Sequence, residues 1–236
     1  MLIAAKLEQV SKRIADACER AHRHPSEINV IAVTKYVALT RAQEALDNGI
    51  VHLGENRWQD AKEKWEQLPL SSAVSSDKPI WHFIGSLQSN KAKDVVGKFD
   101  YIHSLDRLSL AKAIDKQAEQ LDIVVPCFIQ VNVSQELTKQ GIMEGQVYDF
   151  LNELKNYRHI KPIGLMTMAP FEVEPEATRP VFRKLRQWRD DIQNRSDGTS
   201  SITELSMGMS NDFEVAIEEG ATWIRLGTIL VGEKEE

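Results

Sequence analysis

The sequence predicts an α/β protein built as a single (β/α)8 TIM barrel with one extra helix at its N-terminus. Short runs of apolar and β-branched residues alternate with longer segments of helical periodicity, which is typical of parallel strands joined by crossover helices. The strand-like runs are apolar on both faces, as expected for a sheet that is buried on both sides. About eight such runs fit into the 236 residues, an ordinary length for this fold.

The chain begins with an amphipathic helix. Apolar residues recur at helical spacing from Leu2 to Ala21, and Pro25 ends the pattern. His22 and His24 lie near its end, where cations complement the helix dipole. We assign residues 1–24 to this helix, treat 1–236 as a single domain, and expect a frayed charged tail at 233–236.

The strands and helices of the barrel follow in alternation. The predicted strands are Ile28–Thr34, Val51–Gly54, Ile80–Gly85, Tyr101–Leu105, Cys127–Val133, Ile163–Met168, Ile202–Ser206 and Trp223–Leu226. The predicted helices are Thr40–Asn48, Trp58–Gln67, Asn90–Lys98, Arg107–Leu121, Met143–Leu154, Glu176–Gln193 and Asn211–Glu219. The structural alternative is an open, doubly wound sheet, which needs polar edge strands that do not stand out here. Ser-rich segments at 70–78 and 196–201 are expected to be surface loops.

Composition excludes several classes of function. The chain has 29 Lys and Arg against 35 Asp and Glu, a net charge of −6, which argues against a dedicated nucleic-acid-binding protein. No apolar run approaches the roughly 20 residues that span a bilayer, and the N-terminus lacks the features of a signal peptide. Cys18 and Cys127 lie far apart and outside any metal-binding pattern. We therefore expect a cytoplasmic protein with reduced thiols, no metal site and no membrane contact.

Lys35 follows the first predicted strand, at the end of the barrel where active sites of this fold lie. It is the only lysine that directly terminates a predicted strand. A lysine amine in such a position can form a Schiff base with a carbonyl compound. The alternative is a structural ion pair, for example with Glu55.

The loops after the seventh and eighth predicted strands are the usual phosphate site of this fold. The seventh loop, residues 208–211, leads directly into a predicted helix, so its backbone N–H groups can face an anion. The eighth loop adds Gly227 and Thr228, where the glycine lets the backbone approach a ligand closely. Asn211 and Glu214 could instead form a simple capping box.

A Schiff-base lysine opposite a phosphate site in one barrel mouth suggests pyridoxal 5′-phosphate (PLP) as the ligand. Arg225 lies on the eighth predicted strand, and its chemistry matters for the ligand if it faces the pyridine nitrogen. A guanidinium only donates hydrogen bonds and keeps its proton, so that nitrogen would stay unprotonated and the ring would be a weak electron sink. The alternative is an arginine that is salt-bridged to a carboxylate of the barrel.

Six segments of the chain resemble the pyridoxal phosphate homeostasis protein family: GENRWQD at 54–60, WHFIGSLQSNKAK at 81–93, VNVSQELTKQG at 131–141, GLMTMAP at 164–170, LSMGMSNDFEVAI at 205–217 and RLGT at 225–228. The resemblance extends from Val30 to Thr228, and the WHFIG stretch is its most specific part. One departure is Val231, which precedes Gly232 where the family usually has Phe. It concerns the packing of the last turn rather than the cofactor site.

The resemblance implies a single-domain barrel of fold type III, like the N-terminal domain of alanine racemase, with PLP bound covalently as an aldimine on Lys35. It implies that the phosphate is held by Ser210, Gly227 and Thr228 and that Arg225 meets the ring nitrogen. It also places three residues near the cofactor: Asn56, Met207 and Met209.

The function that the resemblance implies is PLP (vitamin B6) homeostasis, as a carrier or buffer without substantial catalysis. Apo PLP enzymes would be possible partners, and we expect a monomer. The alternative is a fold-type-III PLP enzyme, such as an amino-acid racemase or decarboxylase. A racemase needs a second base on the opposite face of the ring, which the racemases take from an added β-domain. The chain ends shortly after its last predicted strand, which favours cofactor carriage.

Two further groups of residues have simpler explanations. Arg179, Arg183 and Arg186 share one face of the helix predicted over 176–193, opposite an apolar stripe that includes Trp188. Arginine interleaved with tryptophan can mimic an RNA-binding strip, but here the aromatic points inward, so we expect a solvated outer face. His82 and His103 are expected to be core or mouth histidines rather than acid–base catalysts.

Overall fold

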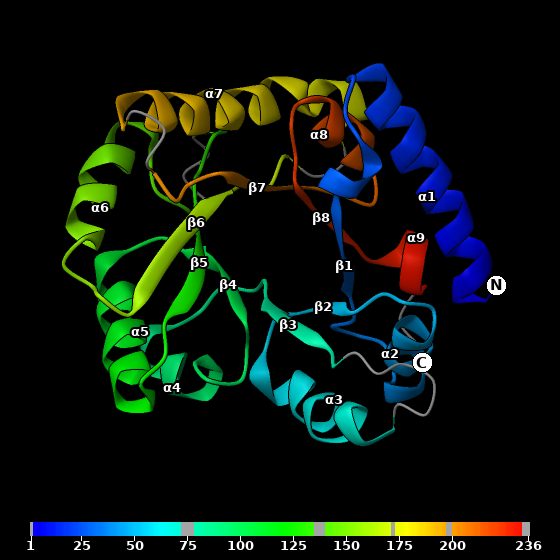
Figure 1. Cartoon of the computed structure of the whole chain (residues 1–236), viewed down its shortest axis with the longest axis horizontal. Coiled ribbons are helices and arrows are strands. Elements are labelled where there is room, and N and C mark those ends of the chain that lie inside the picture. The colour runs from blue at the N-terminus through cyan, green and yellow to red at the C-terminus, as the bar shows by residue number, and fades with distance from the viewer. Residues whose placement is uncertain (1, 72–77, 135–139, 171–172, 197–199, 233–236) are drawn as a thin grey trace.

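Eight parallel strands close into a barrel in the order β1 to β8, with helices around it (Figure 1). The computed structural model describes residues 2–71, 78–134, 140–170, 173–196 and 200–232. The strands are β1 (Asn29–Val33), β2 (His52–Glu55), β3 (Ile80–Phe83), β4 (Tyr101–Leu105), β5 (Val125–Gln130), β6 (Ile160–Met166), β7 (Glu204–Met209) and β8 (Trp223–Leu226). The barrel closes where β1 pairs with β8, with Ile31 opposite Arg225. The predicted (β/α)8 barrel is confirmed.

The helices follow the predicted alternation with two differences. They are α1 (Ile3–Arg20), α2 (Leu39–Asp47), α3 (Trp58–Ser71), α4 (Ala92–Val95), α5 (Leu108–Leu121), α6 (Val147–Leu154), α7 (Arg179–Arg195), α8 (Phe213–Glu218) and α9 (Thr228–Val231). The helix predicted over 90–98 is shorter, because Val96 is extended and Gly97 has a φ of 83°. The short α9 was not predicted. It buries Val231 in the core, so the residue that departs from the family pattern still packs the last turn.

The N-terminal helix α1 is fastened to the outside of the barrel. It packs against α8 and α9 (Figure 1) and buries the predicted apolar stripe, including Val10 and Ile14. On its polar side, Arg13 and Arg20 pair with α8 carboxylates, and Arg23 donates hydrogen bonds to two carbonyl groups at the end of α8. The helix predicted over 1–24 is therefore an integral layer of the fold.

Two apolar cores lie on the two sides of the sheet. The larger one fills the space between the strands and the surrounding helices. The smaller one contains Ile31, Phe128, Met166 and Trp223. The Trp223 ring contacts His52 of β2, and the Phe128 ring stacks on His103 of β4. Because successive strand residues point to opposite faces, both cores follow from strands that are apolar throughout.

The structure also bears on what the sequence indicated about cysteines, membrane spans and metal sites. Cys18 and Cys127 are free and buried, and burial raises the pKa of both thiols. In the described ranges, no helix is both long and apolar enough to cross a bilayer, and no group of side chains is suited to hold a metal ion. The tail at 233–236 and parts of both Ser-rich segments lie outside the described residues.

Candidate functional site

A cavity of about 440 Å³ opens at the carboxyl ends of the strands. It collects most of the predicted site residues, and its lining includes Lys35, Asn56, Met209, Ser210, Arg225, Gly227 and Thr228. A second hollow of about 500 Å³ adjoins it at Asn56, between the loops that follow β2 and β3. Only the first of the two contains both the candidate nucleophile and the candidate anion-binding loops.

Lys35 lies in the turn that follows β1 and is half-buried in the cavity wall. Its Nζ atom lies 5.1 Å from the centroid of the Tyr36 ring. None of the carboxylates that the structure describes forms an ion pair with Lys35. The alternative of a structural pair with Glu55 is therefore wrong, since Glu55 pairs with a different lysine.

That lysine is Lys64 of α3, which binds the residue just before the turn that carries Lys35. Its Nζ atom lies 2.7 Å from Glu55 Oε1 and also donates to the carbonyl oxygen of Thr34. The Thr34 hydroxyl donates to the same carboxylate oxygen at 2.7 Å. Glu55 is fully buried, and burial raises the pKa of its carboxyl against the opposing effect of Lys64. The three side chains thus fix the residue that precedes Lys35.

Lys64 was not predicted, although the sequence contains a signal for it. Ala61, Lys64 and Leu68 follow the helical spacing of a buried stripe, and all three are buried. A lysine at an apolar position of such a stripe indicates a buried ion pair, because a buried charge without a partner is strongly unfavourable.

The loops after β7 and β8 meet beside the cavity. The main-chain N–H of Gly227 donates to the Ser210 hydroxyl at 3.2 Å, which joins the two loops. A Cβ atom added at Gly227 would meet no other atom closer than 3.9 Å. The space over this glycine is therefore open to a ligand group.

The capping-box alternative for the seventh loop is wrong. Asp212, rather than Asn211, precedes α8, and its carboxylate accepts a hydrogen bond from the Met209 N–H at 2.6 Å. Glu214 points to the other side and pairs with Arg13. Asp212 thus holds the loop from within, and the exposed Asn211 forms no capping box with Glu214.

A bulge in β7 decides which methionine reaches the cavity. The pairing of β7 with β8 shifts register between Ser206 and Met209, and Gly208 has a φ of 92°. Ser206 points into the barrel, so Met207 points to the opposite face and is buried in the larger core. The placement of Met207 near the cofactor is corrected accordingly, whereas Met209 lines the cavity as expected.

Arg225 reaches the cavity from inside the barrel and is only 5% exposed. It donates to the Ser206 hydroxyl at 2.7 Å and to the Thr167 carbonyl oxygen at 3.0 Å. Burial lowers the pKa of its guanidinium to about 10, against the opposing effect of Asp212. No salt bridge to Arg225 occurs among the described residues, so the salt-bridge alternative is wrong. Arg225 remains a cation with further N–H donors for a group in the cavity.

The two histidines predicted as core residues are fully buried beneath Arg225. His103 lies 2.9 Å from the Ser206 hydroxyl and 3.0 Å from His82. Burial, the largest effect, lowers the pKa of both imidazoles well below the ordinary value of 6.5. They are neutral, hydrogen-bonded core residues, as expected.

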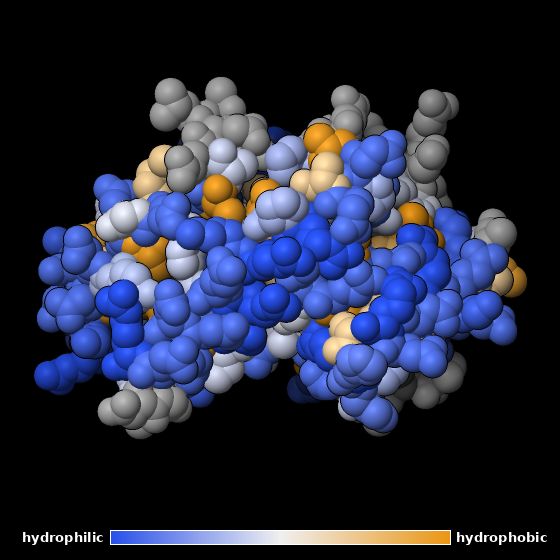
Figure 2. Space-filling view, turned by 90° about the horizontal axis from the view of Figure 1, so that it is seen from above, coloured by the Kyte–Doolittle hydropathy of each residue, from blue (hydrophilic) through white to orange (hydrophobic). Residues whose placement is uncertain are grey.

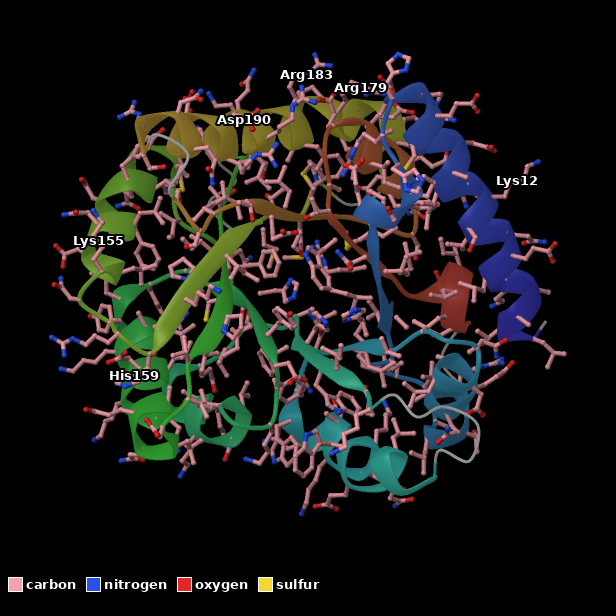
Figure 3. All side chains as sticks on the ribbon, in the orientation of Figure 1. Lys12, Lys155, His159, Arg179, Arg183 and Asp190 are labelled. Atoms are coloured by element: carbon pink, nitrogen blue, oxygen red, sulfur yellow. The ribbon has the colours of Figure 1, made fainter. Side chains whose placement is uncertain are left out.

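The arginines of α7 lie on the outer face of the molecule, as expected, but they are ion-paired there. Arg179 and Arg183 project from this helix (Figure 3), on a strongly hydrophilic side of the molecule (Figure 2). Together with Arg186 they converge on the carboxylate of Glu219, at 3.1, 2.8 and 3.2 Å. Instead of a freely solvated face, they form an ion cluster that fastens α7 to α8. Their charges are already neutralised in part, which weakens the RNA-binding alternative further.

Comparison with known proteins gives concordant results. The sequence model of the family described as "Alanine racemase, N-terminal domain" matches residues 6–235. A protein of Aquifex aeolicus named pyridoxal phosphate homeostasis protein is 42% identical over 231 residues, which are 98% of this chain and 97% of the relative.

Two solved structures bear on the fold. PipY of Synechococcus elongatus PCC7942, solved with PLP bound, has a TM-score of 0.80 at 35% identity and covers 94% of this chain and 100% of its own. An alanine racemase of Clostridium difficile has a TM-score of 0.69 at 16% identity and covers 97% of this chain and 56% of the racemase. The racemase shows a shared fold only.

Proposed function

Since this chain belongs to the pyridoxal phosphate homeostasis protein family, with the fold of the alanine racemase N-terminal domain, we propose that it binds PLP as a Schiff base on Lys35 and acts as a cytoplasmic carrier or buffer of this cofactor. The observation that carries the proposal is that Lys35, Arg225 and the Ser210–Gly227 junction line one cavity. PLP presents an aldehyde, a ring nitrogen and a phosphate, and the cavity offers a complementary group for each.

The phosphate would lie at the junction of the loops after β7 and β8. Ser210 supplies a hydroxyl there, whose oxygen accepts from the Gly227 N–H, and Gly227 leaves open space for an anion. Thr228 adds a main-chain N–H, and backbone N–H groups together with a hydroxyl form a common anion-binding arrangement. Asn56 and Met209 also line the cavity.

Arg225 would donate a hydrogen bond to the ring nitrogen. When bound, PLP supplies an electrophilic aldehyde and an electron-withdrawing ring, and the second property depends on protonation of that nitrogen. A guanidinium does not protonate it, so the ring remains a weak electron sink. This supports carriage of the cofactor over carbanion chemistry.

The cavity also offers little for a two-base reaction. Besides Lys35, the only group in the described lining that can readily accept a proton is Asp212, and this carboxylate is occupied by the Met209 N–H. Racemisation requires a base on each face of the ring. The competing proposal, a racemase or decarboxylase, is supported by the shared fold alone.

The test is to add PLP, reduce with borohydride and locate the adduct by mass spectrometry. We expect one phosphopyridoxyl group on Lys35, and we expect Lys35→Ala to lose both the adduct and the visible absorbance. The control is Lys12→Ala, which removes a lysine on the outer face of α1 (Figure 3) and should change neither. An adduct that persists in Lys35→Ala would refute the proposal, and Lys35-dependent racemisation or decarboxylation would favour the enzyme.

We further propose that the protein works as a monomer and releases PLP to apo forms of PLP enzymes. The large apolar side chains that are exposed in the described part of the chain are few, and most are scattered along it. Light scattering of the PLP-loaded protein should give the mass of one chain. Mixing it with an apo aminotransferase should restore transaminase activity at a rate that Lys35→Ala cannot match.

A further inference from the structure

A row of hydrogen bonds crosses the barrel interior from its floor to the candidate site. His52, the first residue of β2, lies at the floor, and its Nδ1 atom is 3.0 Å from Nε2 of His82. Nδ1 of His82 is 3.0 Å from Nε2 of His103. Nδ1 of His103 is 2.9 Å from the Ser206 hydroxyl, which accepts a hydrogen bond from Arg225. We call these four residues, His52, His82, His103 and Ser206, the histidine chain.

Aromatic side chains enclose the histidine chain. The His82 ring stacks on Tyr101 at a centroid distance of 4.6 Å, and the His103 ring stacks on Phe128 at 4.2 Å. Both imidazoles are fully buried, whereas His52 is half-buried. The stacking fixes the orientation of both rings. Because both imidazoles are buried away from water, their hydrogen-bond partners are their neighbours in the histidine chain.

A neutral imidazole has one donor and one acceptor, so the neutral histidine chain has two complete arrangements of protons. In the first, the Ser206 hydroxyl donates to His103, and each ring donates through Nε2 toward the floor. In the second, each ring donates through Nδ1 toward the mouth, so His103 donates to Ser206. Mixed arrangements would place two donors or two acceptors face to face.

Protonation of His52 selects the second arrangement. A charged His52 carries hydrogen on both ring nitrogens, so its Nδ1–H must donate to His82. His82 must then donate through Nδ1 to His103, and His103 must donate through Nδ1 to Ser206. The proton that is gained resides on His52, while His82, His103 and Ser206 each keep the number of protons they had. The Ser206 oxygen then accepts from both His103 and Arg225, and it no longer donates to His103.

The surroundings of His52 allow it to titrate separately from the rest of the histidine chain. Burial lowers its pKa, and Asp100 partly opposes this. The His52 ring contacts His82 and Trp223, and the charge of Asp100, just before β4, acts on it. Beyond these groups, Tyr101 stacks on His82 and Glu204 lies next to Trp223. Burial, Asp100 and Glu204 raise the pKa of Tyr101, which therefore stays a neutral phenol, and Glu204 is occupied by the indole N–H of Trp223.

We propose that the histidine chain consists of positioning residues for Arg225, through which the protonation of His52 at the barrel floor changes how Arg225 meets the ligand in the mouth. The inference rests on the proposed function, because the ligand group that Arg225 would meet is the ring nitrogen of PLP. A hydroxyl that donates to His103 is a better acceptor for Arg225, since consecutive hydrogen bonds polarise one another. A hydroxyl that accepts from both sides holds Arg225 less firmly.

The first measurement uses the chain without PLP. Protein labelled with ¹⁵N in its histidines is followed by two-bond ¹H–¹⁵N spectra from neutral to mildly acidic pH. We expect His103 Nδ1 to move into the donor range of chemical shifts with the midpoint of His52, while His103 itself stays neutral. In His52→Gln, which keeps a polar group but does not titrate, this linked change should be lost.

His159→Gln is the matched control. His159 (Figure 3) also lies at the floor, immediately before β6. It contacts Asp115 of α5 at 3.3 Å, and among the described residues no bond joins it to the histidine chain. The linked change at His103 should persist in this variant. A His103 Nδ1 shift that is constant across the titration of His52, or that changes equally in His52→Gln, would overturn the inference.

The second measurement follows the visible absorbance of Lys35-bound PLP against pH. The parent chain and His159→Gln should show a spectral component with the midpoint of His52, and both His52→Gln and Ser206→Ala should lack it. Ser206→Ala cuts the histidine chain at its other end, so it decides the question even if His52→Gln folds poorly. If no PLP binds to Lys35, the proposed function fails, and the first measurement still tests the histidine chain by itself.

Discussion

Two buried cations lie near the barrel mouth, and their partners give them different roles. Lys64 is held by Glu55 and Thr34 and has no place in the cavity lining. Among the residues that the structure describes, Arg225 donates hydrogen bonds to neutral groups, a hydroxyl and a carbonyl oxygen. A buried cation whose carboxylate partner is absent remains available to an acceptor that arrives in the cavity. The chemistry of the site therefore depends on Arg225, and its geometry depends on Lys64.

Lys64→Met should destabilise the protein by about 3–5 kcal/mol, because it leaves the fully buried Glu55 carboxylate without its cation. Combining it with Glu55→Gln should restore most of this loss. The control is Lys62→Met on the same helix, whose pair with Glu66 is exposed and should contribute less than about 1 kcal/mol. Urea unfolding of the four proteins measures the differences. Equal losses for Lys62→Met and Lys64→Met would contradict the assigned role.

The individual site residues differ in how far sequence could predict them. Lys35, Ser210 and Gly227 follow from the rule that a barrel of this kind places its site at the carboxyl ends of its strands. The partner of Glu55 does not follow from it, because Lys35 follows the neighbouring strand β1 and Lys64 lies on α3, the helix after β2, so either could be close to Glu55. Only the packing of α3 decides between them.

In β7, a single glycine determines where the side chains at the end of the strand point. The left-handed φ of Gly208 and the register shift turn Met209 and Ser210 toward the cavity, while Met207 stays in the core. Strict alternation along a strand cannot reveal such a bulge. The resemblance placed Met207 and Met209 together near the cofactor, and the bulge separates them: Met207 lies in the larger core and Met209 lines the cavity.

Gly208→Ala should lower stability by about 1–3 kcal/mol, because the backbone at this φ strains any other residue. The added Cβ would also lie 2.6 Å from the Cβ of Ala216 on α8. We expect the displacement to reach Ser210 and to weaken retention of PLP. Gly145→Ala, at a glycine with open space around it, should change stability by no more than about 0.5 kcal/mol. Thermal unfolding and PLP titration of both variants test this, and similar behaviour of the two would count against it.

For the whole molecule, the alternation of strands and helices was enough to predict the closed barrel, but not what lies inside it. Two strands, Tyr101–Leu105 and Trp223–Leu226, have the predicted bounds. The hydrogen bonds between histidines of three strands could not be predicted. Which residues share a level inside a barrel depends on the stagger between neighbouring strands, and periodicity within one strand carries no information about it.

The buried neutral histidines make the whole fold sensitive to mild acid. Burial lowers the pKa of His82 and His103 well below 6.5 in the folded chain, whereas in the unfolded chain they return to about 6.5. Below that value the unfolded state binds more protons, so the free energy of unfolding falls as the pH falls. Each histidine contributes up to about 1.4 kcal/mol per pH unit, or about 3 kcal/mol for both between roughly pH 7.5 and 5.5.

Urea unfolding at a series of pH values in this range measures the slope. His103→Phe should reduce the slope by between about a third and a half, because it removes one of the three barrel histidines whose pKa is lowered by burial. His24→Gln, at an exposed histidine outside the barrel, should leave it unchanged. The carboxylates whose pKa values are lowered in the fold, such as Glu27 and Glu44, act only at lower pH, so they do not obscure the result. A stability that is flat over this range would show that the two imidazoles take up protons in the folded barrel as readily as in the unfolded chain, which contradicts the lowered pKa values.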